Sequence, residues 1–391
     1  MRLHSIEYSE YKDETYRWDL ENLNLININL IVGKNATGKS RVLRLINALA
    51  LLITGAFTPT AIKTGHFKIV LNNESSKKSN KEMSYELEIH NNAVKKEILT
   101  VNGDIKLERD KDISRGRVVF EQVNEGEFID IQVPENNLAV TARRDSKQHP
   151  FFEDLHVWAN RVNYSEFTIK DQNTMSIIDK NIKLDASNLN SIQPNPHLLV
   201  KFGKENHGRN LMGPVITDMR EMGYEISDFG LMPSVGIESP IGNSNIPQLI
   251  YVKEVNIDKK LPQNEISSGM FRALLTLIQL HVTRLEKKPS CVLIDDIAEG
   301  LDFERASKLI SIIIKQAENG YSQFLLTTND RFAMNNVPLE YWCVLEREKG
   351  KVKSYTPRNS PETFKDFEEY GFNNFDFFSK SFYSRSIKNN E

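Results

Sequence analysis

The sequence predicts an α/β protein in which a mixed sheet forms the core, with an antiparallel β subdomain and an inserted helical lobe. Three observations lead to this fold class. An apolar stretch at 26–32 is followed by a glycine-containing loop and a helical pattern, which together form a strand–loop–helix unit. From 67 to 140, short stretches of alternating hydrophobicity are separated by turn residues. From 248 onward, apolar strands and helical patterns alternate, as they do in α/β domains.

The composition limits the number of domains, the kinds of partner and the cellular compartment that we expect for this protein. The chain has 391 residues, and its 39% hydrophobic content is enough for the cores of two or three domains. A net charge of −3 gives no overall positive field for nucleic acid. The two cysteines, Cys291 and Cys343, form no metal-spaced cluster, which suits a reducing cytosol. The first residues lack an apolar signal region, and the longest apolar stretch, 43–57, is too short to span a bilayer. We therefore expect a cytoplasmic protein without membrane contacts.

A phosphate-binding loop is predicted at Gly33–Ser40, which reads G-K-N-A-T-G-K-S. Residues 2–32 before it are expected to form paired strands, the last of which becomes apolar as it enters a sheet core. After the loop, apolar residues recur at helical spacing and predict a helix over 39–54. The N-terminus of that helix adds its dipole to phosphate binding. A glycine-lined surface turn is the alternative interpretation.

Each residue type in this loop has a chemical reason. Gly33 and Gly38 let the backbone curl so that its N–H groups point inward, where a Cβ atom would clash. Lys39 supplies a cation for the outer phosphates, and the Ser40 hydroxyl can ligate Mg²⁺. We predict that the nucleotide is held by Gly33, Lys34, Asn35, Ala36, Thr37, Gly38, Lys39, Ser40 and Arg41.

The middle of the chain is expected to form two inserted parts. Alternating hydrophobicity predicts strands at 83–89, 96–107, 116–122 and 127–133, with turns at 91–92, 102–103 and 124–126. This antiparallel meander cannot belong to a purely parallel nucleotide-binding sheet, so we assign it to a β subdomain. The part that follows is mixed, with predicted helices at 151–162 and near 209–222. Sustained heptads do not occur in the sequence, so we expect no long coiled-coil arms.

The C-terminal half resumes a regular α/β pattern. We predict strands at 249–255, 291–294, 324–328 and 342–348, and helices at 271–288 and 303–318. Pro289 ends the first of these helices, and Asp302 is the expected N-cap of the second. Aromatic residues are dense from Pro357 onward; packing against the body and docking of a partner are both compatible with them.

Two carboxylates, Asp295 and Asp296, follow the short apolar strand at 291–294. A phosphate loop needs an acidic partner for Mg²⁺ at the end of a neighbouring strand, and we assign that role to Asp295. Asp296 is then placed to accept a proton from the attacking water as a general base. Further upstream, Ser267–Gly269 puts a hydroxyl and small residues at a helix start, which is a second anion site. A plain helix cap is the alternative for these serines and for Asp302.

The order of these elements resembles that of an ABC-type ATPase head. A phosphate loop, a long insertion, a serine–glycine helix start, an acidic strand end and Leu301-Asp302 follow one another along the chain. The chain is similar to the ABC-type ATPases related to SMC and RecF heads, and most similar to the stand-alone OLD-like ATPases of prokaryotes, which are associated with defence. The motifs that carry this resemblance cover 1–60 and 248–350.

The resemblance implies a P-loop NTPase of ABC-ATPase type that hydrolyses ATP with Mg²⁺. Ser40 and Asp295 are implied to lie on the metal side, with Asp296, Lys39 and Asn329 as catalytic residues. From the second half of the chain, the residues implied to contact the nucleotide are Ser267, Ser268, Gly269 and Asp302. The domains that follow are an ATPase core over 1–60 and 248–356, the β subdomain at 61–140, the helical and irregular lobe at 141–247, and the aromatic tail at 357–391.

The chain departs from the family pattern at positions that affect the reaction rate. The signature loop, Ile266–Met270, reads I-S-S-G-M where the family has approximately L-S-G-G-Q. Ala36 replaces a glycine of the phosphate loop, and Asp296 replaces a glutamate that is one methylene longer. Asn329 stands in place of the switch histidine and cannot carry a proton or a positive charge. These departures predict slow turnover, which suits a switch better than a motor.

The family geometry implies a homodimer through an ATP sandwich. Two heads stack head-to-tail, and each ATP lies between the phosphate loop of one protomer and Ser267–Gly269 of the other. ATP then favours the closed dimer and hydrolysis releases it. OLD-like relatives carry a fused nuclease, but only about 60 residues follow Asn329 here, fewer than the roughly 100 of such a domain. We therefore expect a separate effector protein, in anti-phage defence.

The main alternative is a RecF-like DNA-binding ATPase in DNA repair. The candidates for a basic face are Arg143, Arg144, Lys147 and the loop at 77–81. An ordinary solvated surface is the favoured interpretation of them, and the net charge does not support DNA. A transporter subunit is disfavoured because more than 200 residues separate Ser40 from Ser267. A metabolic P-loop kinase is disfavoured because it would not need the signature loop or Leu301-Asp302.

Overall fold

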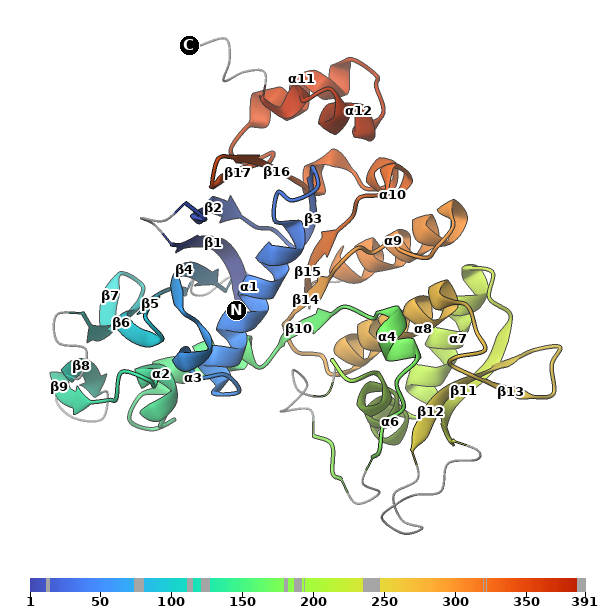
Figure 1. The fold of residues 1–391 in the computed structure, drawn as a ribbon, viewed down its shortest axis with the longest axis horizontal. Coiled ribbons are helices and arrows are strands. Elements are labelled where there is room, and N and C mark those ends of the chain that lie inside the picture. The colour runs from blue at the N-terminus through green and yellow to red at the C-terminus, as the bar shows by residue number, and fades with distance from the viewer. Residues whose placement is uncertain are drawn as a thin grey trace. The chain divides into compact units, whose positions relative to one another are not determined.

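The chain folds into two compact units. The computed structural model describes residues 1–11, 15–73, 81–110, 115–120, 127–178, 182–185, 192, 194–234, 247–318, 320 and 322–384. The first unit is formed by Met1–Val162 and Pro338–Glu391, and the second by Asn163–Val337 (Figure 1). The predicted α/β class with a mixed sheet is confirmed, whereas the four-domain division of the chain stays a prediction.

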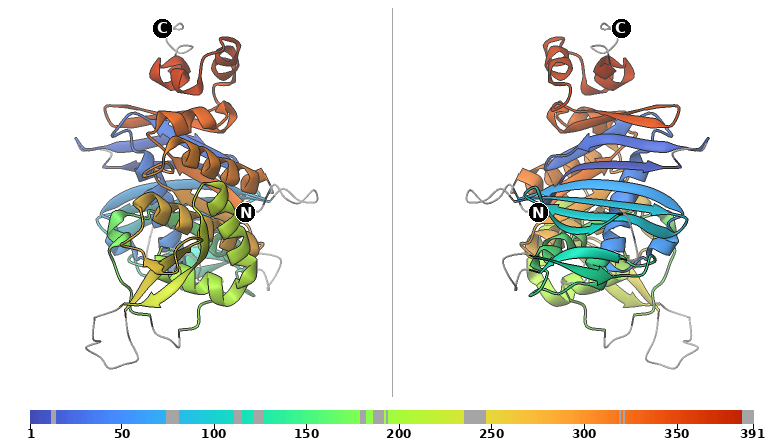
Figure 2. Two further views of the ribbon diagram at one scale, coloured as in Figure 1. Left: turned by 90° about the vertical axis from the view of Figure 1, so that its right-hand side faces the viewer. Right: turned by 90° about the vertical axis from the view of Figure 1, so that its left-hand side faces the viewer.

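The first unit is built on a mixed sheet. Its strands, in spatial order, are β3 (Ile28–Gly33), β16 (Trp342–Glu348), β17 (Lys351–Tyr355), β2 (Trp18–Asn24), β1 (Arg2–Glu10), β4 (Thr64–Asn72), β5 (Glu82–His90), β6 (Ala93–Val101), β7 (Asp104–Arg109), β8 (Arg115–Phe120) and β9 (Glu127–Gln132). The pairs β3–β16 and β17–β2 are parallel, and the other neighbours are antiparallel. The meander strands β4–β9 therefore continue the sheet that holds β1 and β2, and they lie side by side in Figure 2.

Two predicted strands of this unit are each divided by a turn. The predicted strand at 96–107 is two strands, because Asn102 and Gly103 both take positive φ values, 52° and 88°. The predicted strand pattern that leads to residue 32 is interrupted between β2 and β3. There the Asn29 side chain accepts a hydrogen bond from the Ile26 N–H and donates one to its carbonyl, at 2.9 Å and 2.7 Å. The predicted turn at 124–126 lies outside the described residues.

The helices of the first unit bury aliphatic faces and one ion pair. Helix α1 (Lys39–Thr54) has the predicted bounds and packs on α3 (Pro150–Ala159), with the short α2 (Ala139–Ala142) beside it. In the meander, Glu97 and Arg109 form a fully buried ion pair at 2.7 Å. The Glu97 carboxylate also accepts the backbone N–H groups of Ala139 and Val140, at 2.8 Å and 3.1 Å. The pair therefore fixes α2 onto the meander.

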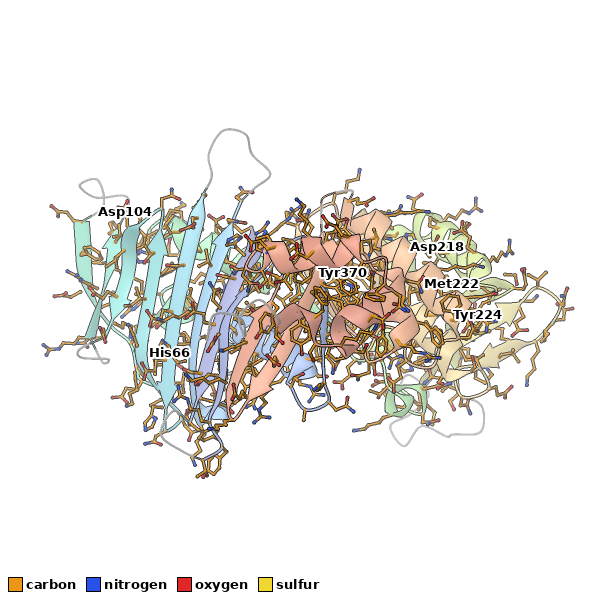
Figure 3. All side chains as sticks on the ribbon, turned by 90° about the horizontal axis from the view of Figure 1, so that it is seen from above. His66, Asp104, Asp218, Met222, Tyr224 and Tyr370 are labelled. Atoms are coloured by element: carbon orange, nitrogen blue, oxygen red, sulfur yellow. The ribbon has the colours of Figure 1, made fainter. Side chains whose placement is uncertain are left out.

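The aromatic tail packs against the body of the first unit. It contains α11 (Pro361–Glu369), α12 (Asn374–Ser379) and the 3-10 turn η4 (Phe382–Ser384). Its buried rings are those of Phe364, Phe367, Phe377, Phe382 and Tyr383. Trp342 of β16 contacts Phe377, with ring centroids 6.4 Å apart. Tyr370, labelled in Figure 3, remains 62% exposed and stacks on Phe372. Packing, one of the two expectations for this tail, is confirmed.

The second unit contains a set of three neighbouring sheet strands, a separate three-stranded sheet and a helical layer. Strand β14 (Ser290–Ile294) lies between β10 (Val162–Ser165) and β15 (Ser322–Thr327), and β14 and β15 are parallel. The other sheet is an antiparallel set of β11 (Ile226–Pro233), β12 (Gln248–Glu254) and β13 (Lys260–Pro262), of which only β12 was predicted. The helices are α4 (Ile169–Gln172), α6 (Pro196–His207), α7 (Arg209–Glu221), α8 (Ser268–Leu285), α9 (Phe303–Glu318) and α10 (Arg331–Asn336). Helices α6 and α7 pack on the buried α8.

Candidate functional site

The phosphate loop connects β3 to α1, and its glycines have no room for side chains. A Cβ atom on Gly33 would lie 2.7 Å from Thr37 Oγ1 and 2.8 Å from the Leu345 carbonyl oxygen. Gly38 has a φ of 109°, and a Cβ atom there would lie 2.6 Å from the Trp18 ring. Ala36 has a φ of 64° although it carries a side chain. It therefore holds a conformation that suits the glycine of the family pattern, at a strain of about 1 kcal/mol.

The polar side chains of this loop bond to the loop itself. Lys39 is only 7% exposed, and its Nζ donates to the Gly33 carbonyl at 2.8 Å. Thr37 Oγ1 donates to the Lys34 carbonyl at 2.8 Å. The ammonium of Lys39 is thus already enclosed by the loop that would hold the phosphates. Arg41, predicted to contact the nucleotide, forms an ion pair with Glu10, and its guanidinium lies 4.5 Å from the centroid of the Trp18 ring.

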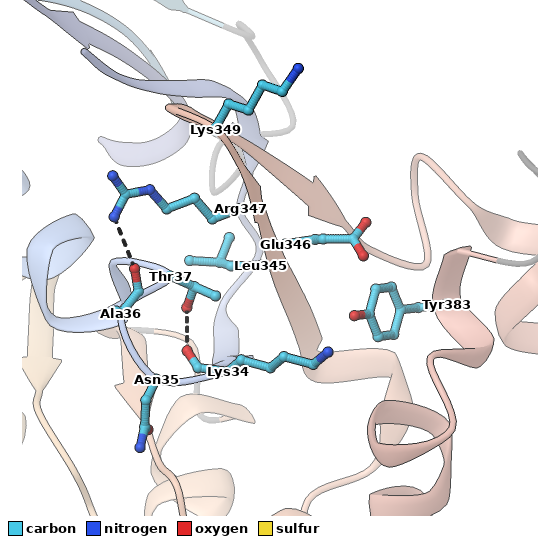
Figure 4. A pocket seen from close by; sticks show the side chains of 9 residues that line it. All are labelled: Lys34, Asn35, Ala36, Thr37, Leu345, Glu346, Arg347, Lys349 and Tyr383. Carbon is cyan, nitrogen blue, oxygen red and sulfur yellow. Dashed lines mark hydrogen bonds between the residues drawn. The ribbon is translucent and has the colours of Figure 1, made fainter. Parts of the chain in front are cut away.

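A pocket of about 430 Å³ lies against the phosphate loop. It is lined by Lys34, Asn35, Ala36, Thr37, Leu345, Glu346, Arg347, Lys349 and Tyr383. In Figure 4 the Lys34 side chain points toward Tyr383, and Arg347 reaches the Ala36 carbonyl, to which it donates at 3.2 Å. Glu346 accepts a hydrogen bond from Tyr355 at 2.9 Å. The positive charges of Lys34, Arg347 and Lys349 in the pocket lining suit an anionic group beside the phosphate loop.

In the second unit, the predicted carboxylates follow β14 and are held by one threonine. Asp295 is 8% exposed and accepts a hydrogen bond from the Thr327 hydroxyl. The same hydroxyl accepts the Asp296 backbone N–H at 2.8 Å. Asp296 has a φ of 51°, which is unusual for a residue with a side chain. Thr327 was not singled out from the sequence, because nothing local marks a threonine at the end of a buried strand.

The electrostatic setting of Asp296 suits a base. Burial raises the pKa of its carboxyl above the ordinary value, and the negative charge of Glu299 acts in the same direction. The backbone N–H of Asn329 and the charge of Arg272 act in the opposite direction on this pKa. A carboxylate with a raised pKa is a stronger proton acceptor. Asn329 itself is exposed and lies between Thr328, which follows β15, and Asp330, the cap of α10.

The signature loop forms the start of α8 and packs tightly on a neighbouring loop. Ser267 caps the helix by accepting the Met270 N–H at 3.1 Å, and the residue remains exposed. A Cβ atom on Gly269 would lie 2.2 Å from the carbonyl oxygen of Gly300, whose φ is 77°. The backbones at these two glycines are therefore in direct contact. This brings the signature loop next to the segment that leads to Asp302.

Arg305 and Tyr224 lie beside the segment at Asp302, and the sequence analysis did not identify them as site residues. Arg305 donates its backbone N–H to Asp302 at 3.0 Å and pairs with the same carboxylate through its side chain. The Arg305 guanidinium lies 4.4 Å from the centroid of the Tyr224 ring, and its Nε donates to the carbonyl of Met222 at 3.2 Å. Tyr224 and Met222 are labelled in Figure 3. The backbone N–H of Arg305 is the main reason that the pKa of Asp302 is lowered. The prediction that Asp302 caps α9 is confirmed.

Three of the basic residues proposed for a DNA-binding face pair with other groups of the protein: Arg143, Arg144 and Lys81. Arg144 forms a bidentate pair with Glu153 at 2.8 Å and 2.7 Å. Arg143 donates to the Gln132 carbonyl at 2.8 Å. Residues 77–80 of the lysine-rich loop lie outside the described residues, and Lys81 pairs with Asp154 at 2.5 Å. This surface gives no specific support for DNA binding.

The residues assigned to Mg²⁺ fit the way this ion is bound. Among the described residues, no group of three or more His, Cys, Asp or Glu side chains could hold a metal ion. Mg²⁺ in nucleotide sites needs only one or two protein ligands beside the phosphates and water. The enclosed carboxylate of Asp295, with a hydroxyl donating to it, and the hydroxyl of Ser40 match this donor set. Within the described part of the chain, no helix is long and apolar enough to cross a membrane.

Comparisons with known proteins give one family match and several structural matches. Residues 28–335 match the family model described as "AAA domain, putative AbiEii toxin, Type IV TA system". An SMC head bound to the C-winged helix domain of ScpA aligns with a TM-score of 0.52 and 12% identity, covering 93% of this chain and 100% of that one. The SMC head domain of Thermotoga maritima has a TM-score of 0.44, 12% identity and coverages of 91% and 99%. The recombination mediator RecF has a TM-score of 0.40, 15% identity and coverages of 90% and 98%. A comparison with curated proteins gave no match.

The family match covers more than half of the chain, and the SMC head shows the fold. ATPases with an AAA domain use ATP, typically with Mg²⁺. The chain belongs to the AAA-domain family whose description names the AbiEii toxin, and its fold is similar to that of an SMC head.

Proposed function

We propose that this ATPase is a slow switch that dimerises on ATP and acts on a separate effector in anti-phage defence. The observation that carries the proposal is the exposed Ser267 at the N-terminus of α8, fixed in place by the contact between Gly269 and Gly300. A hydroxyl and free N–H groups at a helix start bind phosphate. Because this edge faces solvent, it is available to the γ-phosphate of an ATP that a second protomer holds.

The reaction follows from the residues of the two units. The phosphate loop binds the triphosphate, and Lys39 turns its ammonium from the Gly33 carbonyl to the outer phosphates. Asp296 accepts a proton from the water that attacks the γ-phosphorus, and ADP leaves as the bond to the β-phosphate oxygen breaks. Ser40 and Asp295 would hold Mg²⁺, which when bound neutralises charge on the phosphates.

Slow turnover is proposed from the side chains around the water. The Asp296 carboxylate is one methylene shorter than the glutamate of the family pattern, so it must reach further. Asn329 can hydrogen-bond the γ-phosphate but cannot donate a positive charge. Both substitutions lower the rate without removing nucleotide binding, which lengthens the life of the ATP-bound dimer.

The effector is proposed from the family and from a structural neighbour. The family description names a toxin of a toxin–antitoxin system. The SMC head with the same fold is bound to a winged-helix domain of another protein. By analogy, ATP-driven dimerisation of this chain would create or remove a docking surface for a separate protein in the cytoplasm.

The test separates binding from hydrolysis. Asp296→Asn should bind ATP and accumulate a dimer with Mg-ATP, because the proton acceptor is removed and the nucleotide persists. Lys39→Ala should lose up to about 100-fold in ATP affinity, since a charge-assisted hydrogen bond to phosphate contributes up to about 3 kcal/mol. Size-exclusion chromatography with light scattering reports the mass, and Lys308→Ala on the exposed side of α9 is the matched lysine control. A persistent monomer of Asp296→Asn would contradict the ATP sandwich.

A further inference from the structure

Arg272 joins the signature helix to the segment that carries the hydrolytic carboxylate. It lies near the start of α8, and its side chain is only 13% exposed. One of its terminal nitrogens donates to the Asp296 carbonyl at 3.0 Å and to the Asp295 carbonyl at 3.3 Å. The other donates to Glu299 at 2.6 Å and to the Phe167 carbonyl at 2.8 Å. The planar fork of a guanidinium is needed to reach all of these acceptors at once.

The backbone at Asp296 requires such support. Its φ of 51° lies in the left-handed region, which costs a residue with a side chain about 1 kcal/mol or more. The N–H of Asp296 is held by Thr327 Oγ1 at 2.8 Å, and its carbonyl is held by Arg272. The following residue, Ile297, donates its N–H to the Thr327 carbonyl at 3.0 Å. Because the peptide groups on both sides are fixed, the direction of the Asp296 carboxylate depends on these bonds.

The other end of the connection is the signature serine. Ser267 caps α8, and Arg272 lies five residues further along, where each helical residue rises about 1.5 Å along the axis. The helix is buried along most of its length, and Gly269 is pressed onto the backbone of Gly300. A force on Ser267 therefore moves Arg272 with it, since the helical turn between them is rigid.

We propose that Arg272 is a positioning residue that couples the signature loop of each protomer to that protomer's own hydrolytic carboxylate. The proposal rests on the ATP sandwich proposed above. In that dimer, Ser267 contacts the ATP held by the mate, whereas Asp296 acts on the ATP held by its own phosphate loop. Binding of the mate's γ-phosphate thus fixes the geometry of Asp296 through Arg272, and the two nucleotide sites hydrolyse ATP cooperatively.

The experiment measures steady-state hydrolysis against ATP concentration for the full chain and its variants. The wild type should give a sigmoidal curve. Arg272→Ala should give a hyperbolic curve with kcat lowered about 100-fold and with little change in KM, because misplacing a catalytic group by about 1 Å costs that much. Arg272→Lys should be nearly as slow, since one ammonium cannot replace the fork. Arg284→Ala, an exposed arginine at the other end of α8, is the matched control and should behave as the wild type.

Two further measurements separate positioning from folding and from dimerisation. Free guanidinium at low millimolar concentration should restore part of the rate of Arg272→Ala, which it cannot do for an unfolded chain. The mass of each protein with Mg-ATP reports the dimer. A dimeric wild type with a hyperbolic curve, or an Arg272→Ala variant that stays sigmoidal at a near-normal rate, would overturn the coupling alone. A wild type that stays monomeric with ATP would overturn the sandwich and the coupling together.

Discussion

The two units hold their candidate site residues in different ways. In the first unit, the phosphate loop is largely self-supporting: Lys39 bonds to Gly33, six residues away, and Thr37 to Lys34, three residues away. In the second unit, Asp295 is held by Thr327, 32 residues along the chain, and by Arg272, 23 residues back. A local motif brings its own geometry, whereas the carboxylates depend on tertiary structure. We therefore expect substitutions far along the chain to disturb the second site more than the first.

The largest expected effect concerns a buried histidine at the start of α6, in the second unit. His197 is 2% exposed, and burial lowers its pKa to about 4 from 6.5. Only the unfolded chain then binds the proton between pH 6.5 and pH 4, so folding stability falls as the pH falls through this window, by about 3 kcal/mol in total. In denaturant titrations His197→Gln should lose less stability than the wild type between pH 8 and pH 4.5. Equal losses in the two proteins would contradict the buried neutral histidine.

The second prediction tests the contact between two loops of the second unit. Gly269→Ala would place a Cβ atom 2.2 Å from the Gly300 carbonyl oxygen, so the backbones must separate, at about 1–3 kcal/mol of folding stability. Gly213→Ala in α7 is the matched control, because a Cβ atom there meets nothing within 4 Å. That control should instead stabilise the helix by about 0.5–1 kcal/mol. Thermal unfolding measures both, and a Gly269→Ala variant as stable as the control would refute the close contact.

The smallest effect is expected in the first unit, where the loop supports itself. Ala36→Gly removes the strain of a φ of 64°, but it also adds freedom to the unfolded chain, which offsets part of the gain. The net stabilisation should be less than about 1 kcal/mol. Chemical unfolding monitored by circular dichroism measures it. A clear loss of stability would show that the alanine methyl group makes contacts that outweigh the strain.

The same distinction explains what the sequence could predict. Helix α1, helix α9 and strand β16 have the predicted bounds, because each is a continuous pattern with a clear start and end. Helix α8 starts at Ser268, three residues before the predicted Phe271, because the cap by Ser267 lets small polar residues begin the helix. The phosphate loop could be predicted because its residues are contiguous in the sequence.

The features that the sequence did not predict depend on contacts between residues that are distant in the chain. No local sequence pattern marks Thr327, Arg272 or Tyr224 as a site residue. Folding brings Thr327 and Arg272 to Asp296, and it brings Tyr224 to Arg305. The sheet of β11–β13 was largely missed because Gly230 interrupts the apolar pattern of β11 and because β13 has only 3 residues. The roles of Asp295, Asp296, Asn329 and the signature loop in the reaction stay predictions.

The ion pair between Glu97 and Arg109 has a consequence for how the meander opens. Both side chains are fully buried, and breaking either bond leaves an uncompensated charge away from water, at about 3–5 kcal/mol. Fraying at one strand is therefore opposed until water can reach both groups. Hydrogen exchange at the centre of β6 and β7 should then occur in a single cooperative event that also releases the turn at Ala139.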